Sequence, residues 1–179
     1  MIQSRILIAC LIAFFGLSSW ITINGLFIQL PLYAKTLPES WSIGTDLGLI
    51  IQVSNLFPIL LLSIWKIFPR TKNYHLSALV IVLCAIIVTS MYIFFWDSTA
   101  FIFGQERSIG LFLLTFFSGA IDCSSSIVYF PLIQLIEHDY MSALVAGESL
   151  SGSFSALCSL IQDLLGVSVE YYFLSITVL

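Results

Sequence analysis

Charged residues are scarce in this 179-residue chain, in which Asp, Glu, Lys and Arg together make up 9% of the sequence. Soluble domains carry about a quarter of their residues as charges, whereas 59% of this chain is hydrophobic and its mean hydropathy is +1.06. So few polar side chains cannot cover a water-exposed surface, which excludes a soluble domain. The charges that remain form no basic run and give a formal net charge of −4, which excludes a nucleic-acid partner.

Motifs for metal binding, disulfide formation and hydrolysis are also missing. Each of the four cysteines lies in an apolar run, and none has the CxxC or CxxxH spacing of a metal site. We therefore predict buried thiols that pack as small hydrophobic groups. The chain also lacks the GxSxG sequence of a serine hydrolase, so we predict no enzymatic activity and no cofactor.

What the chain has instead is a series of long apolar blocks. A helix needs about 20 such residues to cross the hydrocarbon core of a bilayer. A membrane β-barrel would show ten-residue segments of alternating hydrophobicity, so the blocks predict an all-α, polytopic transmembrane helical bundle. The predicted spans are residues 6–34, 47–65, 76–96, 108–136 and 141–165, within a single membrane domain over residues 1–179.

The final nine residues, Tyr171–Leu179, are apolar but too few to cross a bilayer. We interpret them as the start of a sixth helix. The chain is therefore expected to be a fragment or a truncated product of a longer transmembrane protein.

Half of the six basic residues, namely Lys66, Arg70 and Lys72, lie between the second and third predicted spans. Lys and Arg are enriched in cytoplasmic loops, so this connection and the N-terminus are predicted to be cytoplasmic. By alternation, the connections Lys35–Asp46 and Asp97–Arg107 are predicted to lie outside.

The short turn Glu137–Tyr140 would be cytoplasmic by the same alternation, although it is acidic. Large aromatic residues lie at or near the ends of several predicted spans. Trp and Tyr are enriched at membrane–water interfaces, and this is our interpretation of Trp41, Trp65, Tyr92 and Trp96.

The first predicted span contains polar residues that lipid cannot satisfy. Residues three, four and seven apart share a helix face, so Trp20 and Asn24 lie on one stripe. Gln29 points nearly opposite, unless Pro31 kinks the helix. A large aromatic beside an amide is suited to stack on and hydrogen-bond a ring in a cavity. The alternative is that Asn24 only links two helices, an interaction worth about 0.6 kcal/mol on average; we favour the cavity.

Two acids lie within the later spans. Asp122 is predicted to share a face with Ser118, Ser126 and Tyr129, and Glu148 lies two turns into the fifth span. A charged residue deep in the bilayer costs roughly 2.5–3.5 kcal/mol unless it faces protein or water. Asp122 is therefore either a site on an aqueous path for polar groups or a proton, or a protonated acid bonded to a neighbouring helix. Glu148 is a candidate functional residue on the same grounds.

The second predicted span carries an adjacent pair of amides, Gln52 and Asn55, just before Pro58. Proline leaves a backbone carbonyl of its helix without a partner, and nearby polar side chains can satisfy it. The pair is therefore equally consistent with ligand coordination and with compensation for Pro58.

Ordered motifs run along nearly the whole chain. Phe15–Pro31 contains a Gly, Ser-Trp, Asn-Gly and Leu-Pro in that order. Further motifs are the loop Leu37–Ser42 with the following Asn55, the Cys/Ser-rich segment Cys123–Pro131 and the element Gly147–Gly152. Together, at matching loop spacings, they resemble the eukaryotic riboflavin transporters, solute carrier family 52.

The resemblance implies a multi-pass carrier for riboflavin in the plasma membrane, with eleven spans of which this chain supplies the first five and a stub. Three residues depart from the family pattern: Gln29 replaces a Glu, Ser126 replaces an Asn of some relatives, and Ser149 interrupts a Gly-Leu-Ser element. Transporter sites usually lie between two halves, so this piece alone is not expected to transport. The resemblance leaves the oligomeric state open.

Riboflavin has a flat tricyclic ring, an amide-like edge and a hydroxylated ribityl chain, and it is largely uncharged at neutral pH. Such a ligand calls for an aromatic face with amide and hydroxyl partners rather than a charge clamp. We expect Trp20 to stack on the ring, Asn24 to pair with its edge, and Ser126 and Asp122 to bind hydroxyl groups. The full set of predicted substrate-binding residues is Trp20, Asn24, Asn55, Asp122, Ser126 and Glu148.

Two alternatives accompany this prediction. A second hypothesis is that Glu148 or Asp122 takes up and releases a proton and thereby couples transport to protons. The competing class is a non-transporting multi-pass membrane protein, or an inactive fragment, whose polar faces serve helix packing.

Overall fold

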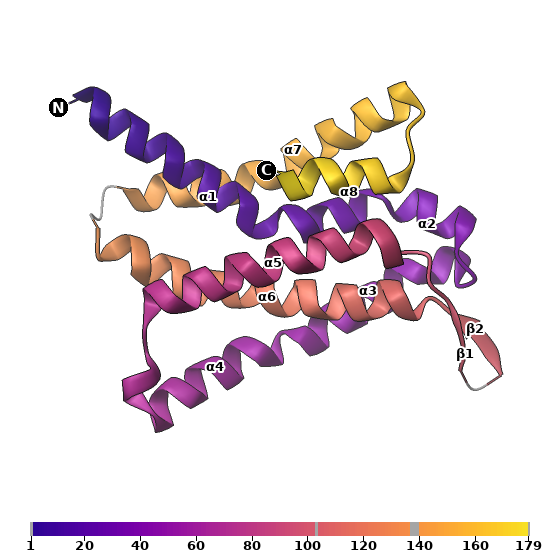
Figure 1. Ribbon diagram of the computed structural model, residues 1–179, viewed down its shortest axis with the longest axis horizontal. Coiled ribbons are helices and arrows are strands. Elements are labelled where there is room, and N and C mark those ends of the chain that lie inside the picture. The colour runs from indigo at the N-terminus through magenta and orange to yellow at the C-terminus, as the bar shows by residue number, and fades with distance from the viewer. Residues whose placement is uncertain (1, 103, 137–139, 179) are drawn as a thin grey trace.

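Five helical segments of the computed structural model are long and apolar enough to cross a membrane. The structure describes residues 2–102, 104–136 and 140–178. The five segments are Ser4–Ile28, Ser40–Ile67, Tyr74–Phe95, Ile109–Gln134 and Met141–Leu165. They overlap the five apolar blocks of the sequence, and the prediction of an all-α polytopic bundle is confirmed (Figure 1).

The described elements lie side by side as a bundle with a small hairpin at one end (Figure 1). In chain order they are α1 (Ile2–Ile28), α2 (Leu30–Thr36), η1 (Ser40–Ser42), α3 (Ile43–Ser54), α4 (Leu56–Ile67), η2 (Pro69–Thr71), α5 (Tyr74–Phe95), β1 (Ala100–Ile102), β2 (Gln105–Arg107), α6 (Ile109–Gln134), α7 (Met141–Leu165) and α8 (Val169–Val178).

The first two spans are each broken into two helices. α1 ends at Ile28 and α2 begins one residue later, with Pro31 in its first turn. The second span breaks at Asn55, just before the first turn of α4, which contains Pro58. Proline lacks an N–H and fits best in the first turn of a helix, so in both spans the break precedes the proline.

Local signals in the sequence also set where α5 begins and where α7 ends. The side chain of Asn73 accepts a hydrogen bond of 3.1 Å from the Leu76 amide and so caps the N-terminus of α5. α7 ends at Gly166, whose φ of 62° is the left-handed conformation that glycine adopts without strain. The turn that follows leads back into α8, which lies where the sequence predicts the start of a sixth helix.

α1 and α7 pack so closely that their backbones touch. A Cβ on Gly16 would overlap the carbonyl oxygen of Leu144, and a Cβ on Gly147 would overlap that of Ala13. Ser155 adds a hydrogen bond of 3.2 Å to a carbonyl of α1. Small residues permit this close approach of membrane helices, and the contact places the polar faces of α1 and α7 side by side.

α6 lies at the centre of the bundle and contacts α1, α3, α4, α5 and α7. Its contact with α3 depends on Gly119, where a Cβ would come within 2.9 Å of the Ser54 side chain. Ser54 also donates a hydrogen bond of 2.9 Å to the Phe116 carbonyl. Because α6 touches so many neighbours, its side chains contribute to cavities on both sides of α1.

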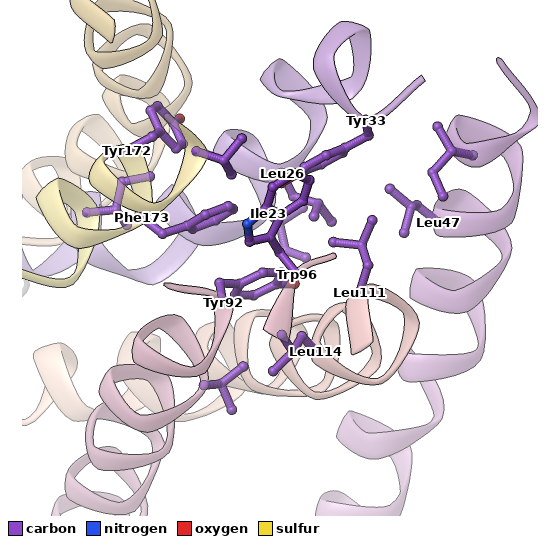
Figure 2. Packing of buried hydrophobic residues seen from close by; sticks show 14 of the residues in the cluster. Ile23, Leu26, Tyr33, Leu47, Tyr92, Trp96, Leu111, Leu114, Tyr172 and Phe173 are labelled. Carbon is purple, nitrogen blue, oxygen red and sulfur yellow. The ribbon is translucent and has the colours of Figure 1, made fainter. Parts of the chain in front are cut away.

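The larger hydrophobic cluster joins α8 to the rest of the bundle (Figure 2). Tyr92 of α5 stacks on Phe173 of α8, with ring centroids 4.5 Å apart and an angle of 11° between the planes. Trp96 is 9% exposed and Trp65, in a second cluster, is 7% exposed. Tyr92, Trp65 and Trp96 therefore pack inside the bundle, whereas Trp41 is 78% exposed.

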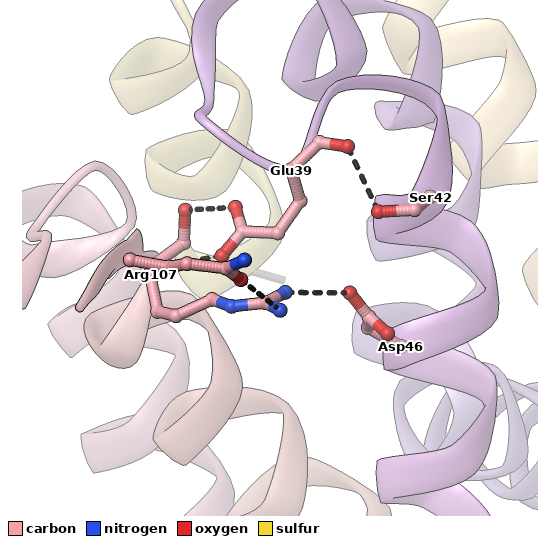
Figure 3. Close-up of polar contacts among 6 residues, drawn as sticks. Glu39, Ser42, Asp46 and Arg107 are labelled. Atoms are coloured by element: carbon pink, nitrogen blue, oxygen red, sulfur yellow. Dashed lines mark hydrogen bonds and ion pairs between the residues drawn. The ribbon is translucent and has the colours of Figure 1, made fainter. Parts of the chain in front are cut away.

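A cluster of polar contacts ties two connections together at one end of the bundle (Figure 3). The buried Glu39 accepts hydrogen bonds from the backbone amide and the hydroxyl of Ser108, at 2.7 and 2.6 Å, and so caps the N-terminus of α6. Arg107 forms an ion pair of 3.6 Å with Asp46. Lys35–Asp46 and Asp97–Arg107 thus meet at one end, as the alternation of spans predicts.

The second of these connections also contains a structure that the sequence analysis did not foresee. β1 and β2 pair as a short antiparallel hairpin, with Ala100 opposite Arg107. The predicted cytoplasmic turn Glu137–Tyr140, by contrast, falls largely on residues 137–139, which lie outside the described residues.

The cysteines are free thiols, but they are not buried. Cys10 is exposed on α1, and Cys84, Cys123 and Cys158 are partly exposed. The prediction of buried thiols is therefore wrong. These positions lie on helices that fit a membrane, where an apolar outer surface contacts lipid and a thiol need not be buried in protein.

Candidate functional site

A cleft of about 390 Å³ opens between α1, α6 and α7. We call it the Trp20 cleft; its lining residues are Trp20, Asn24, Ser126, Glu148, Ser149 and Gly152. Four of the six predicted site residues are among them. The volume falls within the range of about 300–1,000 Å³ that is typical of small-molecule sites. Residues from three separate helices thus converge at one place.

Trp20 and Asn24 reach the cleft from one stripe of α1, as their spacing predicts. Asn24 donates a hydrogen bond of 2.7 Å to the Ser151 hydroxyl, which in turn donates to the Glu148 carbonyl at 2.6 Å. Asn24 therefore both links α1 to α7 and lines the cleft, and the two interpretations of this residue are compatible. Trp20 is half-buried, which leaves part of its indole ring accessible.

Among the described residues, Glu148 supplies the only carboxyl group that lines the Trp20 cleft. Its side chain is partly exposed and lies beside the Ser19 hydroxyl, yet its Oε1 atom is buried and has no hydrogen-bond partner among the described residues. A buried polar atom without a partner costs free energy. Glu148 therefore lies at the cleft with one of its two carboxyl oxygen atoms unpaired among the described residues.

Gly152 determines how much space the cleft offers. A Cβ at this position would meet only the Asn24 side chain, at 3.8 Å or more, which is ordinary van der Waals contact. Unlike Gly16 and Gly147, Gly152 is not required for helix packing. A larger side chain there would extend into the cleft.

Asp122 lies in a different cavity, of about 240 Å³, between α1, α5, α6 and α8. We call it the Asp122 cavity; Thr22, Thr89, Ser125 and Tyr129 also line it. The predicted common face of Asp122 and Ser126 is therefore wrong, because α6 presents Asp122 and Ser125 to this cavity but Ser126 to the Trp20 cleft. Four residues along an α-helix turn through a full circle plus about 40°, so residues 122 and 126 point in different directions. This difference is enough for them to line two neighbouring cavities.

Hydroxyl groups and aliphatic side chains together line the Asp122 cavity. The Thr22 and Thr89 hydroxyls lie 3.3 Å apart, and Thr89 also donates to the Ala85 carbonyl. Asp122 is 3% exposed, and its Oδ2 atom has no hydrogen-bond partner in the described part of the chain. The sequence analysis did not single out Thr22 and Thr89, whose only signal was a polar residue in an apolar helix.

Asn55 is brought to neither cavity. It lies exposed at the break between α3 and α4, and its side-chain amide donates a hydrogen bond of 3.2 Å to Gln52. α3 packs against α6 rather than against α7. The prediction that Asn55 shares a site with Trp20 and Asn24 is therefore wrong.

Gln29 faces α7 rather than away from it. It is 3% exposed, and its side-chain nitrogen donates to Gln162 at 2.5 Å and to Ser159 at 3.4 Å. The break after α1 redirects this residue, which explains why ideal helix geometry misplaced it. Gln29 thus fastens the end of the first span to α7.

Metal-binding clusters are not found among the described residues, where no three His, Cys, Asp or Glu side chains converge. The arrangement in the Trp20 cleft is an aromatic ring, an amide, hydroxyl groups and one carboxyl group. Such a set can bind a flat, polar and largely uncharged molecule by stacking and hydrogen bonds.

Comparisons with known proteins agree on one group. Residues 4–171 match the family model described as solute carrier family 52, riboflavin transporter. No solved structure matches the chain.

The curated relatives carry the same description. A zebrafish (Danio rerio) protein, solute carrier family 52, riboflavin transporter, member 3-A, is 37% identical over 148 residues, which are 83% of this chain and 33% of the relative. The human member 3 is 32% identical over 85% of this chain and 32% of its own length. The riboflavin transporter rft-1 of Caenorhabditis elegans is 35% identical over 86% of this chain and 36% of its own length. The chain thus spans about a third of the length of the relatives that it matches.

Proposed function

This chain belongs to the solute carrier family 52 of riboflavin transporters, and from that membership we propose that it forms the N-terminal part of a carrier for cellular riboflavin uptake. We propose the plasma membrane as its location. The family is one of transporters, and the helices are apolar enough to span a membrane. Riboflavin is the proposed substrate because the relatives are named as riboflavin transporters.

The observation that carries this proposal is the Trp20 cleft, where four of the six predicted substrate-binding residues line one space. Trp20 stacks on the tricyclic ring, and Asn24 pairs with the amide-like edge. Ser126 and Glu148, which both line the cleft, bind ribityl hydroxyls. Asp122 no longer has a role in flavin binding, since it lines a separate cavity.

The cleft forms one side of the proposed substrate path. It is open, and transporter sites generally lie between two halves of the protein near the middle of the membrane. About two thirds of each relative's length lies outside the matched part. We propose that this remainder supplies the opposite side, so that uptake requires both.

A second role is proposed for the two acids, namely proton coupling. Asp122 Oδ2 and Glu148 Oε1 are both buried without partners among the described residues. An unpaired charge at such a position is costly, so exchange of a proton would change how each acid interacts with its surroundings. If uptake is insensitive to pH, and also to Glu148→Gln and Asp122→Asn, proton coupling by these acids is wrong.

A chimera tests the main proposal. Residues of this chain replace the matching third of the zebrafish relative, and tritiated riboflavin uptake is measured in cells that take up little riboflavin of their own. We expect saturable uptake, with an apparent KM raised about tenfold by Trp20→Ala, because an aromatic stack on a base is worth about 1–3 kcal/mol.

The matched control is Trp41→Ala, which removes a tryptophan that is 78% exposed and far from the cleft in sequence. Surface expression of each variant is measured in parallel. An unchanged KM for both Trp20→Ala and Asn24→Ala would contradict the assignment of the cleft. Flavin fluorescence quenching by the purified chimera separates a carrier from a non-transporting membrane protein, which would not bind riboflavin.

A further inference from the structure

An apolar groove runs along the outside of the bundle between α4 and α5. α4 lies at the edge of the bundle, in contact with α6 but apart from α5 (Figure 1), although only a short connection joins α4 to α5. The space between them, of about 660 Å³, is floored by α6. Its lining is almost entirely apolar and includes Leu60, Ile64, Val80, Ile87, Phe117 and Ile121.

The break in the second span explains why this groove exists. α3 packs closely on α6 through Ser54, whereas α4 begins after the break at Asn55 and makes fewer contacts with α6. The side chains of α4 are largely exposed, with Leu60 at 55% and Ile64 at 49%. In a membrane such a surface contacts acyl chains, because water is absent there.

A cluster of basic residues lies at one end of the groove. Lys66 is in the last turn of α4, Arg70 is in η2 and Lys72 follows directly, while Ile64 and Leu76 on either side of this connection line the groove itself. All three basic side chains are exposed. No acid occurs in the sequence between Asp46 and Asp97, and none of the three basic residues forms an ion pair within the described residues.

Aromatic contacts hold this connection in place. Trp65 packs edge-on against Tyr74, with ring centroids 5.4 Å apart, and the Lys72 ammonium lies 5.2 Å from the centre of the Tyr74 ring. A cation over an aromatic ring keeps its full charge. The Lys72 charge is therefore held at the mouth of the groove without being neutralised, and Lys66 and Arg70 lie on the same connection.

We propose that this groove binds an anionic phospholipid, with one acyl chain between α4 and α5 and the headgroup phosphate at Lys66, Arg70 and Lys72. The apolar walls match the chain and the three uncompensated charges match the headgroup. Anionic lipids are enriched in the cytoplasmic leaflet, the side on which the same charges place this connection. If the basic residues served only to orient the protein in the membrane, they would not need an apolar groove beside them.

Native mass spectrometry of the chain in mild detergent, with added phosphatidylserine or phosphatidylcholine, tests the headgroup. We expect preferential retention of phosphatidylserine. Each basic residue near a membrane surface contributes about fivefold to affinity for anionic lipid, so the triple variant Lys66→Gln, Arg70→Gln, Lys72→Gln should weaken retention by on the order of 100-fold. The double variant Arg5→Gln, Lys35→Gln removes charges elsewhere on the chain and should retain the preference.

Two tryptophan substitutions on α5 test the groove independently of charge. Val80 and Leu83 are 50% and 51% exposed, but only Val80 lines the groove. We expect Val80→Trp to fill the groove and abolish phosphatidylserine retention, and Leu83→Trp to leave it unchanged; circular dichroism verifies that both fold.

Three results would overturn the proposal. The first is equal retention of the two lipids by the unsubstituted chain. The second is equal behaviour of Val80→Trp and Leu83→Trp. The third is loss of phosphatidylserine binding in the chimera with the zebrafish relative, which would mean that protein rather than lipid covers the groove. None of these results bears on riboflavin binding in the Trp20 cleft.

Discussion

The two polar faces of α1 differ in how their polar groups are satisfied. On one face, Trp20 and Asn24 line the open Trp20 cleft with Glu148 of α7. On the other face, Thr22 is 5% exposed and lines the Asp122 cavity with Thr89 and Asp122. One helix thus supplies a partly exposed site on one side and an interior polar cavity on the other.

The difference separates residues that are available to a substrate from residues that serve the interior. Several hydroxyl groups of the Asp122 cavity bond within their own helices, as Ser125 does to the Asp122 carbonyl at 2.7 Å, and Thr22 of α1 pairs with Thr89 of α5. A buried carboxyl group without a partner is tolerated most readily in its neutral form. The Trp20 cleft instead exposes an aromatic ring and an acid, so a flavin is expected to contact this face of α1 and not the other.

The largest expected effect comes from separating α1 from α7. Gly16→Leu would place a side chain against the Leu144 carbonyl and should lower the free energy of unfolding by about 3 kcal/mol or more, since overpacking forces the backbones apart. Unfolding by sodium dodecyl sulfate, followed by circular dichroism, measures this. The control is Gly48→Leu, where a Cβ meets nothing within 4 Å. Equal destabilisation by the two variants would contradict the close contact.

Filling the Trp20 cleft should have the next largest effect. Gly152→Leu extends into the cleft, so we expect the Kd for riboflavin to rise about tenfold or more, a loss of roughly 1.4 kcal/mol. Leucine is the better helix former, so folding should be retained. Flavin fluorescence titration of the chimera measures the Kd. Ser153→Leu, at an exposed position of the same helix, should bind normally; a similar loss in both variants would argue against the cleft.

The Asp122 cavity should respond differently. Asp122→Asn keeps the size of the side chain, so we expect the protein to fold and the riboflavin Kd to change less than about twofold, because Asp122 lines a different cavity. The same titration, together with Glu148→Gln, checks this. An Asp122→Asn effect as large as that of Glu148→Gln would mean that the two faces of α1 are not separate.

The smallest expected effect concerns α8, which forms one side of the Asp122 cavity. Hydrogen bonds from the Ser168 hydroxyl and from the Trp96 indole, the latter at 2.9 Å, lower the pKa of Glu170. A lowered folded-state pKa stabilises the protein above the unfolded-state value of about 4.3, and this contribution is lost as the pH falls through the lowered pKa. Glu170→Gln should therefore reduce the acid-induced loss of stability slightly.

The measurement is the midpoint of thermal unfolding between pH 6 and pH 3. Asp163→Asn, an exposed acid near the end of α7, is the matched control and should behave as the unsubstituted chain does. An identical pH profile for Glu170→Gln and the unsubstituted chain would show that this contact does not hold α8.

The positions of the spans could be predicted from sequence because about 20 apolar residues in a row have few other structures available. The stripe of Trp20 and Asn24 was predicted for a similar reason, since helix periodicity fixes which residues share a face. Periodicity does not reveal which helix lies opposite. The pairing of α1 with α7 depends on Gly16 and Gly147, whose backbone contacts join positions far apart in the sequence.

The errors have related causes. Gln29 was misplaced because the helix breaks at that residue, and Asp122 was grouped with Ser126 because a rotation of about 40° per four residues seemed too small to separate them. Asn55 was included for its likeness to a family motif, although α3 packs on α6 and away from the cleft. The spacing of residues along each helix therefore predicted most of the residues that line the cleft. Contacts between helices determine which of the predicted residues reach it.

Ser125 and Ser126 provide the most direct test of the central claim, because these neighbouring residues face the Asp122 cavity and the Trp20 cleft respectively. In a cysteine-free form of the chimera, Ser125→Cys and Ser126→Cys are each labelled with a small thiol reagent, with and without riboflavin. The account predicts that riboflavin slows labelling at position 126 and leaves labelling at position 125 unchanged. Protection at position 125, or at neither position, would contradict it.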